Sequence, residues 1–197
     1  MNNEQLECLS NALARFASIT AAEGAVQHAK NVLNFIAAEP HPWSRATVAG
    51  HITASAWVLD RTRTHAALIH HRKLNRWLQP GGHVEDADAT WRAAAQREVT
   101  EETGLTHFIR QPDDELFDVD VHPIPARKNE PAHFHYDLRF LFVADVNATL
   151  DHKLHVNLYE VRDCRWFALA DLANDPTMES SMRRMIELCL CPNVGRR

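Results

Sequence analysis

The first 39 residues of the chain alternate between apolar and polar positions at the spacing of an α-helix. One apolar stripe recurs at steps of three and four residues, at Leu6, Leu9, Leu13 and Phe16. A second stripe follows at Ala22, Val26, Ala29, Leu33 and Ile36. Thr20 and Glu23 have the spacing of a capping box before this second stripe, and Pro40 and Pro42 end it. The pattern predicts a helical hairpin whose apolar stripes pack on the main domain or join two subunits.

From about Val48 onwards the pattern changes to that of short strands. Residues 52–59 and 66–70 are apolar runs on either side of a polar turn, and residues 165–167 form a shorter run. Around Val119 apolar and polar residues alternate with the period of a half-buried strand. Residues 136–144 are rich in aromatic and β-branched side chains. These segments predict a β-sheet.

Two further helices are predicted in this part of the chain. The first covers residues 89–103 and is followed by Gly104. The second covers residues 176–190, with Asp175 as its N-cap and Pro176 in its first turn, where the missing amide costs little. The predicted fold class is therefore α+β, a mixed sheet with helices packed on it. We expect the hairpin to occupy residues 1–45 and the main domain residues 46–197.

Composition and charge exclude several classes of function. The 197 residues include 21 Lys and Arg against 26 Asp and Glu, a net charge of −5, without the concentrated basic face that duplex nucleic acid requires. No apolar run approaches the roughly 18 residues that span a bilayer, and the first residues lack the features of a signal peptide. We therefore expect a cytoplasmic protein with no membrane partner. The 13 histidines are unusually many, but their scattered spacing argues against a histidine-rich metal-binding protein.

Three glutamates are gathered near the end of the helix predicted over residues 89–103. Glu98, Glu101 and Glu102 lie at positions i, i+3 and i+4 and therefore share one face. Their mutual repulsion and the negative end of the helix dipole would destabilise the helix unless divalent cations lay between them. A solvated acidic face is the alternative. Arg97, beside Glu98, carries a rigid fork of donors that can hold a carboxylate.

The residues around these glutamates resemble the motif of the Nudix hydrolase family, G-x5-E-x7-R-E-U-x-E-E-x-G-U, where U is a bulky apolar residue. Residues 97–105 match its second half without a fault. The first half departs from it: five residues separate Gly82 from Asp88, and eight rather than seven separate Asp88 from Arg97. Asp88 or Glu85 would then take the place of the first glutamate. The Pro-Gly-Gly sequence that ends at Gly82 permits a tight turn and a close approach of backbone to ligand.

This resemblance implies a Nudix-type mixed β-sheet sandwiched between helices, and a pyrophosphohydrolase that uses Mg²⁺ or Mn²⁺. Such an enzyme hydrolyses the phosphoanhydride bond of a nucleoside diphosphate linked to another moiety. By position, Glu98, Glu101 and Glu102 would be metal ligands, and the backbone carbonyl of Gly82 a further one. One carboxylate would also help to deprotonate the attacking water, so that Glu101, Glu102 and Arg97 form the catalytic set, with Arg97 as the residue that orients the others.

Five residues are candidates for binding the substrate: His70, Arg72, Lys73, His83 and His135. The first three leave the second predicted strand just before the motif, where positive groups could meet a diphosphate. The last lies in a proline-rich loop between two strands, which could close over a ligand. Glu160, in a later loop, is a candidate general base. For each of these residues an ordinary surface or core role is the alternative.

The expected partner is a small nucleotide-type substrate, and a homodimer through the hairpin is a further option. The alternative function is that of a non-catalytic Nudix-fold domain that binds nucleotides or regulates another protein. Such domains usually lose the acidic cluster, whereas this chain keeps all three glutamates. The sequence therefore favours the enzyme, although the motif does not specify which diphosphate it hydrolyses.

Overall fold

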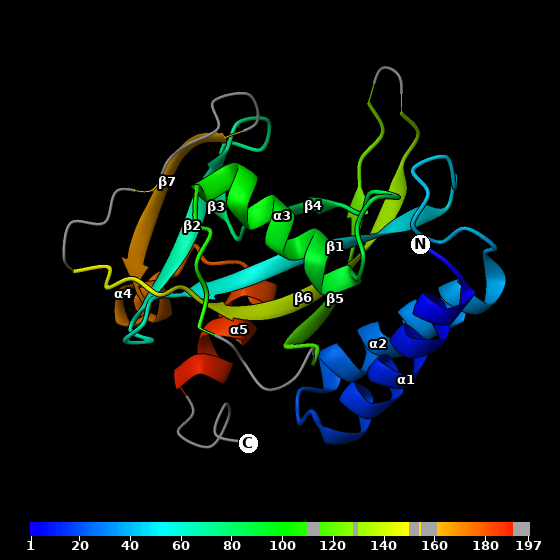
Figure 1. Cartoon of the computed structure of the whole chain (residues 1–197), viewed down its shortest axis with the longest axis horizontal. Coiled ribbons are helices and arrows are strands. Elements are labelled where there is room, and N and C mark those ends of the chain that lie inside the picture. The colour runs from blue at the N-terminus through cyan, green and yellow to red at the C-terminus, as the bar shows by residue number, and fades with distance from the viewer. Residues whose placement is uncertain (110–114, 128–129, 150–153, 155–160, 191–197) are drawn as a thin grey trace. The chain divides into compact units, whose positions relative to one another are not determined.

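The computed structural model of the chain describes residues 1–109, 115–127, 130–149, 154 and 161–190 (Figure 1). Backbone contacts divide the chain into two compact units. The first unit consists of Met1–Ser55, Gly82–Ala95 and Asp114–Phe140, and the second of Ala56–Gly81, Gln96–Asp113 and Leu141–Arg197. The domain boundary between residues 45 and 46 stays a prediction.

The N-terminal segment forms the predicted pair of helices, α1 (Asn3–Ile19) and α2 (Glu23–Ala38), at the blue end of Figure 1. The capping box lies at the start of α1, where the Asn2 side chain accepts the Gln5 amide at 3.0 Å and the Gln5 side chain accepts the Asn2 amide at 2.7 Å. The prediction of a capping box at Thr20 is wrong, because α2 begins after Ala22 without a side-chain cap. The Thr20 hydroxyl instead accepts the amide of Ala22 at 3.4 Å.

Helix α2 packs on its own unit, which is the first of the two alternatives for the hairpin. Its Phe35 ring stacks on Tyr136 with ring centroids 3.9 Å apart, and its His28 ring lies 3.2 Å from the Val119 carbonyl oxygen. The buried face is rotated by one position from the predicted stripe, so that only Ala29 is common to both. The fully buried residues of the two helices are Leu9, Leu13, Phe16, Ala25, Ala29, Val32 and Phe35.

Among the described residues, seven strands form the sheet, in the order β3-β2-β1-β6-β5, with β4 paired to β1 and β7 paired to β2. The strands are β1 (Gly50–Leu59), β2 (His65–His71), β3 (Arg76–Leu78), β4 (Gly81–His83), β5 (Asp118–Ile124), β6 (His133–Val143) and β7 (Val161–Ala168). Strand β2 is antiparallel to β1, β3 and β7, and β5 is antiparallel to β6.

Strands β1 and β6 run parallel to each other. The Phe134 amide donates to the Ala49 carbonyl near the beginning of both strands, and the Ala144 amide donates to the Leu59 carbonyl at their ends. The sheet is therefore mixed, and the predicted α+β class is confirmed.

The helices beyond the hairpin are α3 (Trp91–Thr103), α4 (Leu169–Asn174) and α5 (Ser180–Leu190). The predicted start of the last helix is wrong. Asp175 follows α4, and its carboxylate accepts the Thr177 amide at 2.8 Å and the Thr177 hydroxyl at 2.7 Å, which forms a turn through Pro176. Among the described residues, no helix combines the length and apolar character needed to cross a membrane.

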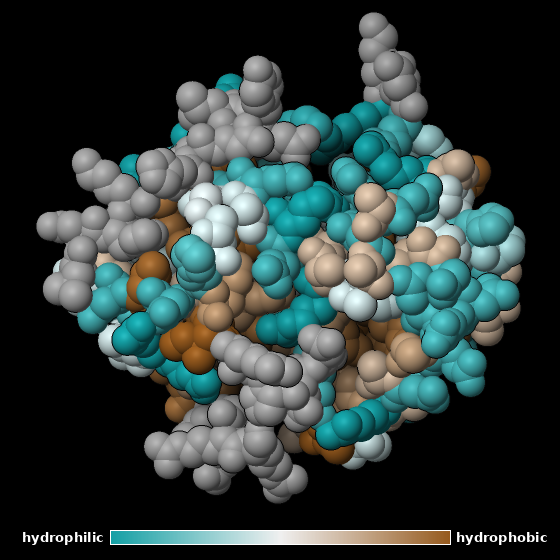
Figure 2. Space-filling view, viewed as in Figure 1, coloured by the Kyte–Doolittle hydropathy of each residue, from teal (hydrophilic) through white to brown (hydrophobic). Residues whose placement is uncertain are grey.

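The surface drawn in Figure 2 mixes hydrophilic and hydrophobic side chains. Over the N-terminal helices, teal hydrophilic groups are interspersed with smaller brown ones. The outer faces of α1 and α2 carry exposed charged residues such as Glu7, Arg15 and Lys30, as expected for amphipathic helices whose apolar stripes are buried.

A buried arginine of β6 forms ion pairs with three aspartates of β5 and β6. Arg139 is 2% exposed and donates to Asp137, Asp118 and Asp120 at 2.8, 3.0 and 3.2 Å. The register places Asp120 directly opposite Asp137, an arrangement of like charges that is destabilising without a counter-ion. Thr53 and Ser55 of β1 add hydrogen bonds to Asp137 at 3.1 and 2.8 Å.

We expect Arg139→Met to lower the free energy of unfolding by about 3–5 kcal/mol, because it leaves buried carboxylates without their counter-ion. Urea denaturation followed by circular dichroism measures this loss. Arg15→Met is the matched control, since Arg15 pairs with Glu115 at an exposed site and such pairs contribute about 1 kcal/mol or less. Equal stabilities of the two variants would contradict the prediction.

Asp120 gives the fold a dependence on acid pH. Burial alone would raise the pKa of Asp120, but a hydrogen bond from His122 and the charges of Arg139, His122 and His28 hold it well below its usual 3.8. A depressed carboxyl pKa stabilises the folded state above the unfolded pKa, and this stabilisation is lost as the pH falls through the folded pKa. The window therefore lies below about pH 4.

We expect Asp120→Asn to be less stable than the parent at pH 7 but to lose less of its stability between about pH 4 and pH 2. Urea titrations at a series of pH values measure the free energy of unfolding for both proteins. Parallel curves over the acid range would show that the ionisation of Asp120 does not contribute to the stability of the fold.

Candidate active site

The three glutamates of the motif occupy the last turns of α3. Glu98 and Glu102 are 9% and 5% exposed, whereas Glu101 is exposed. Val99 and Thr103 are buried on the same helix, and the helix ends at Gly104, whose φ of 72° is readily adopted only by glycine. Two of the carboxylates are thus held at a buried position while the third faces solvent.

Arg97 lies between two of these carboxylates. Its Nη1 donates to Glu98 Oε1 at 3.0 Å and lies 3.5 and 3.4 Å from the two carboxylate oxygens of Glu101. Glu98 and Glu101 are therefore both paired with one nitrogen of Arg97.

The third carboxylate is fixed by the glycine turn before the helix. The Gly81 amide donates to Glu102 Oε2 at 2.9 Å. Gly81 has a φ of 154°, which a side chain would strain, so this turn requires glycine. The Pro-Gly-Gly segment was predicted to approach a ligand closely. In this structure it contacts Glu102 of the motif.

A buried thiol lies in the same unit as the glutamates. Burial, together with the negative charges of Glu102 and Asp163, raises the pKa of Cys164 to about 12. A thiol with so high a pKa stays protonated at neutral pH, and the thiolate is the nucleophilic form. Cys164 is therefore part of the packing and no candidate nucleophile.

The two candidates for the first motif carboxylate are engaged with each other. The Asp88 carboxylate accepts the Glu85 amide at 2.8 Å, and the Asp88 amide donates to the Glu85 carbonyl at 3.1 Å. Asp88 is 8% exposed, whereas Glu85 is exposed. Asp88 thus closes the loop before α3, and which of the two replaces the family's glutamate stays open.

Three of the predicted substrate-binding residues lie at one end of β2. His70 is the last but one residue of the strand, and its ring contacts Trp77 with centroids 5.2 Å apart. Arg72 and Lys73 follow in the exposed turn between β2 and β3. They belong to the same compact unit as Glu98, Glu101 and Glu102.

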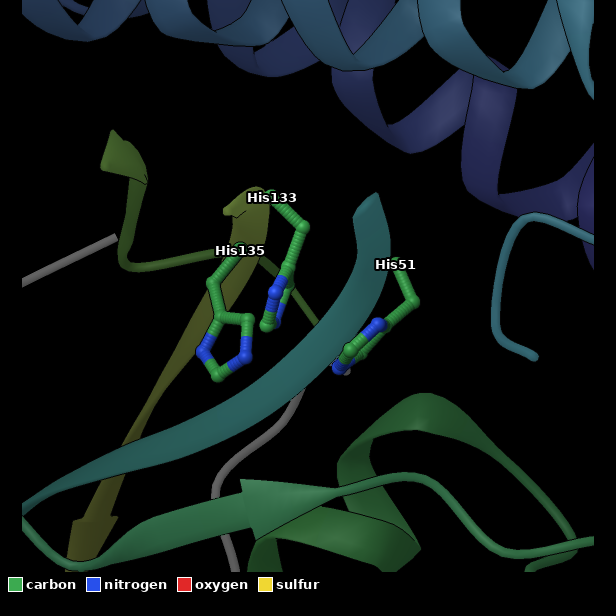
Figure 3. A group of neighbouring side chains, drawn as sticks. All are labelled: His51, His133 and His135. Carbon is green, nitrogen blue, oxygen red and sulfur yellow. The ribbon is translucent and has the colours of Figure 1, made fainter. Parts of the chain in front are cut away.

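The other two, His83 and His135, belong to a cluster of histidine rings in the first unit. The prediction that His135 lies in a loop is wrong, because it is on strand β6, as is His133. His51 of β1 faces them: its ring centroid is 5.1 Å from that of His133 and 4.8 Å from that of His135 (Figure 3). The ring centroid of His83 lies 5.0 Å from that of His51, and the ring centroid of His122 lies 5.6 Å from that of His135.

Burial and the charges of neighbouring histidines lower the pKa values of His51 and His135. Burial lowers the pKa of His51 to about 4, and the charge of His133 adds to this effect. Burial, reinforced by the charges of the neighbouring histidines, lowers the pKa of His135 to about 2. The ligand nitrogens of His51, His133 and His135 all lie within 4.8 Å of one another. Sequence reasoning missed His51, although the i, i+2 spacing of His133 and His135 in a strand already places that pair on one face.

Two predicted residues cannot be placed beside the glutamates. Glu160, the candidate base, lies outside the described residues. Gly82, the candidate backbone ligand, belongs to the first unit, whereas the glutamates belong to the second. Both assignments stay predictions.

Comparison with known proteins covers most of the chain. A family model described as NUDIX domain matches residues 49–189. Phosphatase NudJ of Escherichia coli (strain K12) is 30% identical over 125 residues, which span 61% of this chain and 69% of that protein. These two sequence matches show which family the chain belongs to.

Solved structures are similar at lower identity. A NUDIX family hydrolase from Clostridium perfringens has 20% identity and a TM-score of 0.47, and the similarity covers 71% of this chain and 93% of that chain. The NUDIX domain of NrtR from Shewanella oneidensis, complexed with ADP ribose, has 18% identity and a TM-score of 0.48, covering 81% of this chain and 94% of that chain.

Proposed function

We propose that this chain, which belongs to the Nudix hydrolase family, is a Mg²⁺-dependent pyrophosphohydrolase. Its substrate would be a nucleoside diphosphate linked to another moiety, and water would cleave the phosphoanhydride bond. The observation that carries this proposal is the cluster of Glu98, Glu101 and Glu102 on α3, held by Arg97 and by the Gly81 amide. A cytoplasmic location stays a prediction from the sequence.

The donor set fits a hard divalent cation. All of its side-chain donors are carboxylate oxygens, which Mg²⁺ and Mn²⁺ prefer over nitrogen or sulfur. Two of the carboxylates are largely buried, where uncompensated negative charge is costly. Glu98, Glu101 and Glu102 would hold the cation, with the Gly82 carbonyl as a proposed further ligand. When bound, the cation would neutralise the diphosphate and lower the pKa of attacking water.

The protein's own groups would orient the reaction. The Gly81 amide fixes one oxygen of Glu102, and Arg97 fixes the direction of Glu98, so that neither carboxylate has to reorganise when substrate arrives. Glu101, whose side chain is 50% exposed, is the carboxylate open to accept a proton from water. Glu160 is the alternative base proposed from the sequence.

Arg72 and Lys73 would attract the diphosphate. Both are exposed cations in the turn after β2, within the unit that carries the glutamates. Repulsion between a phosphate and a carboxylate about 4 Å away is roughly 4 kcal/mol at an effective dielectric constant of 20, so cations near the acidic cluster would help substrate to approach. His70 would line the same end of β2, and the roles of His83 and His135 in substrate binding stay predictions.

We expect Glu102→Gln to lower kcat by at least about 100-fold, because the amide keeps the acceptor for Gly81 but loses the charge that holds the cation. The rate at which the cleaved nucleotide appears, followed by chromatography for a panel of nucleotide sugars, ADP-ribose, dinucleoside polyphosphates and nucleoside triphosphates with Mg²⁺ or Mn²⁺, measures it. Glu187→Gln, at an exposed glutamate of α5, is the control and should match the parent.

The same panel separates the enzyme from the alternative function. A parent protein that binds a member of the panel in calorimetry but releases no product from any of them would be a non-catalytic nucleotide-binding domain. A Glu102→Gln variant as fast as the parent would show that the carboxylate assignment is wrong.

For the substrate that the panel identifies, we expect Arg72→Gln and Lys73→Gln to raise KM by about tenfold each while kcat changes little, because hydrogen bonds to charged groups contribute about 1.5–3 kcal/mol. Steady-state kinetics at fixed ionic strength measures both constants. Lys30→Gln, at an exposed lysine of α2, is the control. An unchanged KM in both variants would exclude this turn from the binding site.

A further inference from the structure

The geometry points to a second metal site, distinct from the glutamates of α3, in which His51, His133 and His135 bind a nitrogen-preferring divalent cation such as Zn²⁺. His51 comes from β1 and the other two from β6, and Figure 3 shows the three rings close together beside these two strands. All of these residues lie in the first compact unit. The proposal concerns metal binding itself and does not depend on the proposed hydrolysis.

The backbone brings the three residues together at a position that only glycine allows. Gly50 has a φ of 146°, and a Cβ atom built on it would lie 2.2 Å from the carbonyl oxygen of Phe134. The Phe134 amide also donates to Ala49 at 3.1 Å. Strands β1 and β6 therefore meet closely where Gly50 precedes His51 and where Phe134 separates His133 from His135. The alternation of a strand places the latter two histidines on one face.

Three ring nitrogens of His51 and His133 have no hydrogen-bond partner among the described residues. His51 is 1% exposed, and within the described part of the chain neither of its ring nitrogens has a hydrogen-bond partner. The same is true of His133 Nε2, which lies 3.9 Å from Glu130 Oε1, beyond hydrogen-bond distance. A buried polar atom without a partner costs about 1–3 kcal/mol. A cation bound by these nitrogens would remove that cost.

One of the ligands is already oriented for coordination. His133 Nδ1 lies 2.9 Å from the Pro131 carbonyl oxygen, so this nitrogen carries the proton and Nε2 presents its lone pair to the cluster. A backbone carbonyl on the second ring nitrogen is the usual way in which proteins orient a metal-binding histidine. The lowered pKa values of His51 and His135 agree with neutral imidazoles, the form that binds metals.

The donor set determines which cations fit. Three imidazoles suit Zn²⁺, Co²⁺, Ni²⁺ or Cu²⁺, whereas Mg²⁺ prefers oxygen ligands. Zn–N distances of about 2.0–2.1 Å correspond to nitrogen separations of about 3.4 Å in a tetrahedral site. The nitrogens now lie within 4.8 Å of one another, so small side-chain rotations close the site.

The alternative is a set of histidine rings that pack as aromatic groups without a metal. The stacking of His51 on His133, with 26° between the rings, would satisfy that interpretation. It leaves the nitrogens of His51 without partners, whereas coordination uses them. Metal binding that depends on these side chains therefore distinguishes the two.

The test is a titration of the full-length, chelator-treated protein with Co²⁺, a spectroscopic substitute for Zn²⁺. Nitrogen ligands in a four-coordinate site give Co²⁺ a strong visible absorption, whereas octahedral oxygen ligands give a weak one. We expect one Co²⁺ per chain with the strong band, displaced by Zn²⁺. His135→Gln and His51→Gln should weaken the affinity by more than about tenfold, since even outer partners of metal-binding histidines contribute 10- to 100-fold.

Two control variants make the result specific. His107→Gln removes an exposed histidine of the other unit and should leave the band unchanged. A variant with Glu98, Glu101 and Glu102 all changed to Gln should also keep it, because the proposed Mg²⁺ site is a different one. Circular dichroism establishes that each variant is folded, and His135→Gln decides alone if the buried His51→Gln does not fold.

The proposal is overturned if the parent shows no strong band, if both histidine variants keep it, or if it disappears only in the glutamate variant. Failure of the proposed hydrolysis would not affect this outcome, because the readout is the spectrum of the metal and not turnover.

Discussion

The register of β5 against β6 brings like charges together, and much of the first unit depends on how these charges are compensated. It places Asp120 opposite Asp137 in a buried position, and Arg139, which hydrogen-bonds to both, supplies a buried positive charge. The same aspartates also interact with other elements of the unit. Thr53 and Ser55 of β1 donate to Asp137, and the His28 ring of α2 lies 3.1 Å from Asp120. A single guanidinium thus holds together two strands directly, and β1 and α2 through its partners.

The chain separates two kinds of donor chemistry. Helix α3 gathers carboxylates, whose oxygens suit hard cations and phosphate chemistry, and Arg97 limits their repulsion without cancelling it. Strands β1 and β6 gather imidazoles, whose nitrogens suit borderline cations. Imidazole nitrogens bind Mg²⁺ poorly, so Mg²⁺ would select the carboxylates. Three of the 13 histidines belong to the second set.

Elements with a strong local period could be predicted from the sequence, whereas details set by tertiary contacts could not. The hairpin, the β1–β2 pair and α3 follow from spacing alone. The cap at Thr20 was wrong because Ala22 starts α2 without a side-chain cap, and the rotation of its buried face depends on Phe35 stacking on Tyr136. Asp175 was misassigned because its carboxylate bonds to Thr177 in a turn instead of opening α5.

The two candidate sites differ in the same way. The glutamates lie on one helix within five consecutive positions, so helical geometry alone brings them together. The contact between Glu102 and the Gly81 amide was not foreseen, because it depends on the path of the turn. His51 and His133 are 82 positions apart in the sequence and meet only through the parallel pairing of β1 with β6. The sequence contains no local signal of that pairing, which is why His51 could not be assigned to the cluster from the sequence.

The link between His28 and the Val119 carbonyl has a consequence for how the protein is made. The two residues are 91 positions apart, so α2 is complete long before β5 exists. At a synthesis rate of 5–20 residues per second, the interval is roughly 5–20 s. During that time the apolar face of α2, which contains Phe35, has no sheet to cover it. The nascent hairpin is therefore the stage of biogenesis at which a chaperone would find an apolar surface to hold.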